Sequence, residues 1–174
     1  KKISDFLKSQ KINMSNIQVQ NYAEYLNNAF LIHKVSRYDI EGKRIFEIGE
    51  KYYFEDLGIR NALIGYRISD RGKILENMVF HHLKIAGFDI KIGGLNSQEI
   101  DFVADKNGER IYVQVALSID GDKTAEREFG NLLKIADNYP KYVVTLDEFE
   151  GNSINGIKCM SFIEFMTEIL GESL

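Results

Sequence analysis

Residues 99–116 read EIDFVADKNGERIYVQVA, and this stretch decides the fold class. Two apolar runs, residues 100–104 and 111–119, flank the polar residues 105–108. This arrangement is typical of two antiparallel strands joined by a tight hairpin. Asp101 lies in the first run and Gln114 in the second, so we expect their side chains on adjacent strands.

Helices and strands alternate on both sides of this hairpin. The expected elements rest on helix-period apolar spacing, β-branched runs and glycine or proline stops. They are helices over residues 71–86, 124–139 and 161–170, strands over 88–92, 142–146 and 158–160 (the last at the sheet edge), and a turn at Gly93-Gly94. Such an alternation predicts an α/β domain with a mixed sheet over residues 67–174.

Residues 1–66 have a different organisation. Ser4 and Ser15 are candidate N-caps of two helices. The second helix has apolar residues three or four positions apart, which predicts one buried face: Val19, Tyr22, Ala23, Leu26 and Phe30. Strand-like runs follow over residues 31–40, 44–48 and 51–54, and a short helix over 56–63 leads into the second part. Two helices beside a hairpin are the outline of a winged helix-turn-helix.

The composition is that of a globular protein. Of 174 residues, 44% are hydrophobic and 28% charged, and the net charge of −4 argues against non-specific nucleic-acid binding by the whole surface. No apolar run approaches the roughly 20 residues of a membrane span. Cys159 is the only cysteine, so we expect a reducing, cytoplasmic location. Because the chain begins with Lys1, we expect a fragment of a longer protein.

Three polar residues are the candidates for chemistry. Glu76 shares a helix face with apolar residues, and Asp101 and Gln114 lie on the two strands. Glu76 and Asp101 are the candidate ligands of Mg²⁺, which prefers carboxylate oxygens. Structural roles are equally open: Glu76 paired with Arg71 or Lys73, Asp101 forming a turn, and Gln114 bonding to backbone. His81 and His82 are neighbours on a helix and point about 100° apart, so we do not expect them to share a metal ion.

The order of these residues resembles the core of PD-(D/E)xK nucleases. That pattern has a helical Glu, an Asp at a strand end, and Glu-x-Lys on the next strand. The resemblance implies a restriction-endonuclease-like mixed sheet, with Glu76, Asp101 and Gln114 at the catalytic positions. Gln114 replaces a carboxylate and Ala116 replaces the lysine, so the resemblance implies a degenerate site. Lys134 could supply a displaced lysine, although an exposed helical lysine is the simpler interpretation.

The hairpin of the first part carries candidate nucleic-acid-binding cations: Arg37, Lys43, Arg44 and Lys51. Phosphate contacts dominate the affinity of proteins for DNA, so such cations could give weak DNA contact. The second helix offers several amides but no Lys or Arg. A solvated, charged surface is the simpler interpretation of these four residues.

Five stretches resemble one bacterial and archaeal family: residues 51–61, 76–77, 99–104, 112–116 and 139–142. The family is the AAA-type ATPases with a C-terminal domain of unknown function after their P-loop module. The resemblance implies that this chain is such a C-terminal part, whose partner is the ATPase module of the same polypeptide. ATP would then bind only that module, because this chain has no phosphate-binding loop.

Three functions therefore stay open. The first is a non-catalytic accessory module that binds nucleic acid or a protein. The second is a metal-dependent nuclease with a displaced lysine. The third is a protein-interaction or oligomerisation domain.

Overall fold

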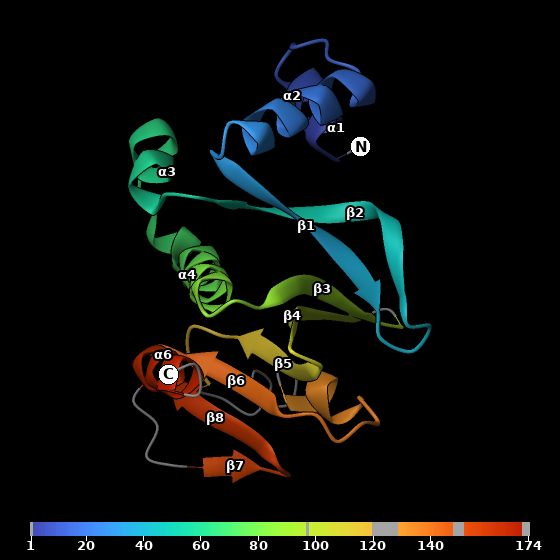
Figure 1. The fold of residues 1–174 in the computed structure, drawn as a ribbon. Coiled ribbons are helices and arrows are strands. Elements are labelled where there is room, and N and C mark those ends of the chain that lie inside the picture. Colours follow the sequence, from blue (N-terminus) through green and yellow to red (C-terminus); the bar gives the residue numbers. More distant parts are fainter. Residues whose placement is uncertain (1, 97, 120–128, 148–151, 172–174) are drawn as a thin grey trace.

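A computed structural model describes residues 2–96, 98–119, 129–147 and 152–171, and its centre is one mixed sheet. The strand order is β2-β1-β3-β4-β5-β6-β8-β7 (Figure 1). The strands are β1 (Ile32–Asp39), β2 (Arg44–Phe54), β3 (Asp89–Leu95), β4 (Gln98–Lys106), β5 (Glu109–Val115), β6 (Lys141–Thr145), β7 (Asn152–Ile154) and β8 (Ile157–Ser161). The helices are α1 (Lys2–Ser9), α2 (Asn16–Asn28), α3 (Leu57–Ile64), α4 (Arg71–Ile85) and α6 (Phe162–Gly171), with a 3₁₀ turn at Ile68–Asp70. The predicted mixed α/β architecture is confirmed.

Two hydrophobic clusters lie on opposite faces of the sheet. The first, which we call the α4-side core, joins Leu75, Val79 and Leu83 of α4 to Phe165 of α6 and to alternate residues of the central strands. The second joins Phe129 and Leu132 of the helical residues 129–133 to the other alternate residues, including Tyr112 and Val143. Because strand side chains alternate between faces, successive residues of a regular strand join opposite clusters.

Several predicted turns and caps are confirmed. The Ser15 side chain accepts from Gln18 N while the Gln18 side chain accepts from Ser15 N, which is a capping box. Asp56 caps α3, and Gly87 follows α4 with a φ of 87°. Asn107 and Gly108 both have positive φ at the β4–β5 turn, as a tight hairpin requires.

Four element predictions are wrong, and so is the predicted cap Ser4, which lies inside α1 and donates from its Oγ to Met14 O (2.6 Å). Gly93 and Gly94 lie inside β3, where a Cβ on Gly93 would lie 2.8 Å from Ile100 Cβ, so close strand packing explains the glycine. Residues 44–54 form one strand instead of two. Strand β8 is covered by β7 and is not at the edge.

The fourth wrong prediction concerns the helix over 124–139. Residues 120–128 lie outside the described residues, and the described helix ends at residue 133. Asp137 instead accepts hydrogen bonds from Tyr112 Oη (2.6 Å) and Tyr139 N (3.3 Å). An aspartate that bonds to nearby backbone favours a turn over a helix.

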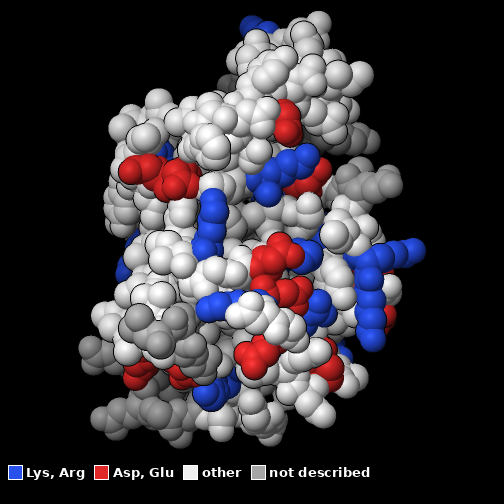
Figure 2. All heavy atoms as spheres, viewed as in Figure 1, with Lys and Arg blue, Asp and Glu red and all other residues white. Residues whose placement is uncertain are grey.

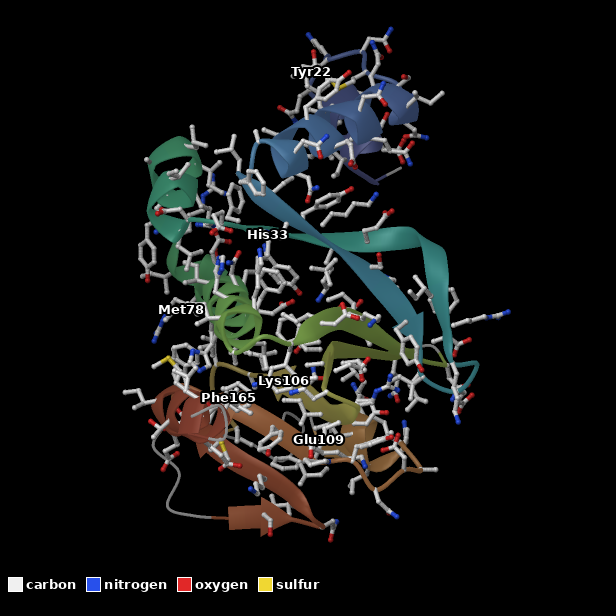
Figure 3. All side chains as sticks on the ribbon, viewed as in Figure 1. Tyr22, His33, Met78, Lys106, Glu109 and Phe165 are labelled. Atoms are coloured by element: carbon white, nitrogen blue, oxygen red, sulfur yellow. The ribbon has the colours of Figure 1, made fainter. Side chains whose placement is uncertain are left out.

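The order helix, helix, hairpin is found over residues 2–54, but the hairpin continues into the sheet. Strand β1 pairs in parallel with β3 through Arg37–Asp39 and Ile92–Gly94. Helix α2 has no buried residue, and Tyr22 lies on it, away from the sheet (Figure 3). Of the predicted buried face, Tyr22, Leu26 and Phe30 are exposed, and Val19 and Ala23 are only partly buried. No helix among the described residues has the length and apolar character needed to cross a membrane.

Candidate functional site

A cluster of three carboxylates surrounds the ammonium group of Lys51. Lys51 Nζ lies 2.9 Å from Glu76 Oε1, 2.6 Å from Glu99 Oε1 and 3.6 Å from Asp101 Oδ1. Lys51 comes from β2, Glu76 from α4, and the other two from β4. We call these four residues the Lys51 cluster.

Neighbouring side chains hold this cluster in place. Tyr53 Oη donates to Glu76 Oε1 (2.6 Å), and the Tyr53 ring stacks on Phe80 with centroids 4.5 Å apart. Phe80 is one helical turn after Glu76, so a single helix face positions both. Arg37 lies 2.5 Å from Glu99 Oε2. The compensating group for Glu76 is thus Lys51, and not Arg71 or Lys73, since Lys73 faces Asp70.

Burial and the neighbouring charges act in opposite directions on the pKa values of Lys51 and Glu99. Burial on its own would lower the pKa of Lys51, but attraction to Glu76 and Asp101 and the hydrogen bond to Glu99 outweigh it and raise the pKa. Burial would raise the pKa of Glu99, but Lys51 and Arg37 hold it below its usual value. Burial and the Glu76 carboxylate raise the pKa of Tyr53, so this phenol stays neutral and donates.

A β-bulge places Asp101. Lys91 pairs with Val103 and Gly93 pairs with Ile100, so β4 has one more residue than β3 between these pairs. Asp101 Oδ2 accepts a hydrogen bond from Val115 N (2.9 Å), while its Oδ1 faces Lys51. The carboxylate therefore bridges the β5 backbone and the Lys51 cluster.

Gln114 lies on the other face of the sheet. Val113 and Val115 pack in the α4-side core, whereas Tyr112 and the Gln114 neighbour Val143 pack in the second cluster. Alternation along β5 therefore turns Gln114 away from Glu76. Its Oε1 is buried and accepts no hydrogen bond from a described residue. Ala116, at the end of the same segment, donates from its backbone N to Val144 O (3.0 Å).

The structure thus brings together two of the three predicted catalytic residues, Glu76 and Asp101, which are also the two predicted metal ligands. Their carboxylates fit the chemistry of Mg²⁺, but the Lys51 ammonium lies where these oxygens converge. Lys134 is not in this cluster: its Nζ donates to Gln98 Oε1 (2.9 Å). Sequence reasoning missed Glu99 as a member, although its position two residues before Asp101 was a usable signal.

Most of the hairpin cations are neutralised by acids. Arg37 contacts Glu99, Arg44 lies 3.3 Å from Asp39, and Lys51 is the centre of its cluster. Lys43 is exposed at the turn and makes no ion pair with any described residue. Of the four predicted nucleic-acid-binding residues, three therefore have part of their charge compensated within the protein.

Comparisons with known proteins identify relatives without a described activity. Residues 3–70 match a family described as a domain of unknown function (DUF8612). An uncharacterized protein of Haemophilus influenzae is 38% identical over 167 residues, which is 96% of this chain and 41% of that protein. The uncharacterized protein MJ1544 of Methanocaldococcus jannaschii is 31% identical over 109 residues, or 63% of this chain and 22% of MJ1544. No solved structure matches the chain. The chain spans about two fifths of the length of the Haemophilus influenzae relative. Together, the two relatives place similar sequences in both bacteria and archaea.

Proposed function

We propose that this chain is a non-hydrolytic accessory module of an AAA-type ATPase, with a degenerate PD-(D/E)xK nuclease-like core that serves protein binding. The observation that carries this proposal is the position of Lys51 between Glu76, Glu99 and Asp101. A Mg²⁺ ion would need the same carboxylate oxygens. The ammonium of Lys51 therefore competes with the ion for its ligands.

An ammonium cannot replace the chemistry of a metal ion. Mg²⁺ in a nuclease binds water and substrate together and so generates the nucleophile. Lys51 offers three donors and no site for a coordinated water. Its raised pKa keeps it protonated at neutral pH, so it also does not act as a general base.

The charge distribution favours a protein partner over nucleic acid. Basic and acidic groups are interspersed over the face seen in Figure 2, and the N-terminal helices at its top are mostly uncharged. The cations of the hairpin are largely paired with carboxylates, as described above. Phosphate binding needs cations that are free to neutralise phosphates.

An exposed apolar surface supports the protein-binding part of the proposal. Large apolar side chains of α2, α3 and the segments after them are exposed, including Phe30 (74%), Leu63 (72%) and Ile68 (76%). Where exposed apolar side chains gather into one surface, that surface marks an interaction site. Since the Haemophilus influenzae relative extends well beyond the matched region, we propose that the occupant is the ATPase module of the same polypeptide.

Nuclease and metal-binding assays test the non-hydrolytic part. With Mg²⁺ or Mn²⁺ we expect no cutting of plasmid, single-stranded DNA or RNA above the level of an Asp101→Asn variant. Calorimetry should show no Mg²⁺ binding to the wild-type chain and a gain of binding in Lys51→Met, because removal of the ammonium frees the carboxylates. Lys43→Met, which removes an exposed cation of the same hairpin, should not gain Mg²⁺ binding.

The same assays test the second candidate, a nuclease in which Lys51 is the displaced lysine. The convergence of one lysine with Glu76 and Asp101 is the observation that favours it. Metal-dependent cutting by the wild-type chain that is lost in both Lys51→Met and Asp101→Asn would establish this candidate and exclude our proposal.

A further inference from the structure

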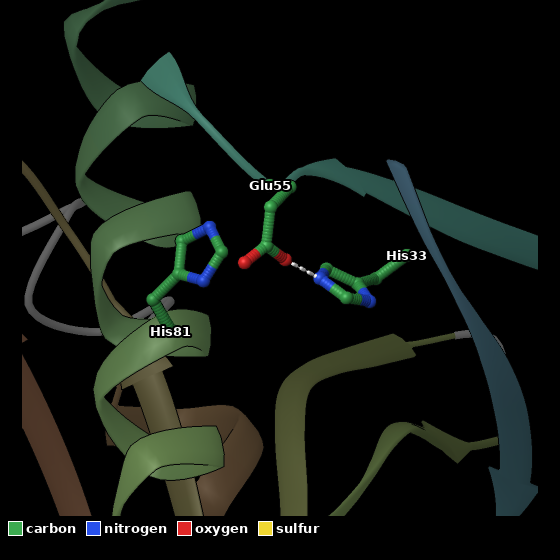
Figure 4. Close-up of side chains that lie close together, drawn as sticks. All are labelled: His33, Glu55 and His81. Carbon is green, nitrogen blue, oxygen red and sulfur yellow. Dashed lines mark hydrogen bonds and ion pairs between the residues drawn. The ribbon is translucent and has the colours of Figure 1, made fainter. Parts of the chain in front are cut away.

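Two imidazoles and a carboxylate converge at a second place, away from the Lys51 cluster. His33 is on β1, Glu55 directly follows β2, and His81 is on α4. One ligand atom from each residue lies within 4.8 Å of the others. Figure 4 shows the Glu55 carboxylate between the two rings, and it contacts His33 Nε2.

The surrounding hydrogen bonds orient His81 as a metal ligand. His81 Nε2 lies 2.7 Å from Phe54 O, so this nitrogen carries the proton and Nδ1 carries the free electron pair. Asn77 fixes the same backbone: Phe54 N donates to Asn77 Oδ1 and Asn77 Nδ2 donates to Phe54 O, both at 2.9 Å. A carbonyl that accepts from the second ring nitrogen is the usual outer partner of a metal-bound histidine.

His33 and Glu55 are also placed where their side chains can bind a metal ion. The His33 ring packs on Phe80 with centroids 5.5 Å apart, and its side chain is only 15% exposed. The Glu55 side chain is half exposed, which leaves the cluster open to solvent on that side.

We propose that His33, Glu55 and His81 bind Zn²⁺. Two nitrogens and one carboxylate oxygen are a ligand set of zinc, whereas Mg²⁺ and Ca²⁺ take oxygen ligands. Three protein ligands leave the fourth tetrahedral position to water. The bound ion would fasten the β1–β2 hairpin to α4.

The Lys84 ammonium opposes binding of the ion. Its Nζ lies 3.0 Å from both ring nitrogens of His33. Lys84 is exposed, so its side chain can turn into solvent when Zn²⁺ binds. The Lys84 ammonium competes with Zn²⁺ for the His33 ring. Removal of Lys84 should therefore strengthen zinc binding.

Zinc titration of the chain tests the proposal, with calorimetry and thermal unfolding as readouts. We expect one Zn²⁺ per chain and a raised unfolding temperature. His33→Ala, His81→Ala and Glu55→Gln should each weaken binding, the histidine variants by more than about 100-fold, since loss of an outer partner alone costs 10–100-fold. The chain has only three histidines, and His82, whose Nε2 lies 3.1 Å from Met166 O, is the matched control.

His82→Asn should bind Zn²⁺ like the wild-type chain, and Lys84→Met should bind it more tightly. Affinity should fall as the pH is lowered, because protons compete with Zn²⁺ for its ligands. Bound Co²⁺ should show tetrahedral ligand-field bands without a thiolate charge-transfer band. No binding at a large excess of Zn²⁺, or unchanged affinity in Glu55→Gln and in folded histidine variants, would overturn the proposal.

Discussion

At the scale of the residue, Gln114 is the least satisfied group of the described core. Its Oε1 is buried without a hydrogen-bond donor, which costs about 1–3 kcal/mol. Gln114→Leu, with an apolar side chain of similar size, should raise the free energy of unfolding by about 1 kcal/mol. Gln114→Glu should lower it, because a buried carboxylate costs more than a buried amide. Urea unfolding of the three chains measures both changes, and a destabilised Gln114→Leu chain would mean that the amide has a partner.

Glu99 is the second residue-scale case, because its ionisation makes the free energy of unfolding depend on pH. Its two cations lower its pKa below the usual 4.5 although burial opposes this. A depressed folded pKa contributes stability above 4.5 that is lost as the pH falls through the folded value. Glu99→Gln should therefore lower the unfolding temperature at neutral pH and flatten its decline in acid. Thermal unfolding from neutral pH down into acid measures this, and Glu109→Gln, at an exposed position of β5, should leave the decline unchanged.

The predicted proximity of Glu76 and Asp101 is observed, because their order along the chain places them on facing elements, while their catalytic and metal-binding roles stay predictions. Prediction from the sequence failed for Gln114, whose face depends on strand parity and on how the bulge in β4 shifts the register. Lys51 could be selected as a charged residue of the hairpin, but its partner carboxylates are on elements 25 or more positions away along the chain. A tertiary ion pair of that kind has no local sequence signal.

At the scale of the element, the capping residues were predictable and the glycine pair was not. Ser15, Asp56 and Gly87 act within one turn of chain, so local patterns identify them. Gly93 is instead required by packing: a Cβ there would lie 2.8 Å from Ile100 Cβ and 3.0 Å from Val103 Cγ2.

Gly93→Ala should destabilise the protein by about 1–3 kcal/mol through overpacking. Gly94→Ala is the matched control, since its Cβ would meet only Phe46 Cε2 at 3.4 Å and Tyr38 O at 3.6 Å. Equal losses in the two variants, measured by urea unfolding, would contradict this account of β3.

At the scale of the whole molecule, the first two helices lie outside the hydrophobic clusters of the sheet. Both hydrophobic clusters consist of residues from 35 onward, and α2 buries none of its residues.

Removal of residues 1–29 should therefore shift the unfolding temperature by less than about 4 °C, roughly the shift that 1 kcal/mol produces in a domain of this size. It costs the hydrogen bonds from Lys34 N to Asn27 Oδ1 and from Leu31 N to Leu26 O, and the ion pair of Lys34 with Glu24, but no buried apolar contact of the described clusters. Circular dichroism melts of the full and shortened chains measure the shift. A shortened chain that fails to fold would mean that α1 and α2 belong to the core. An unchanged melt would mean that their apolar side chains contribute little to this fold, and such a surface is then available for the partner that we propose.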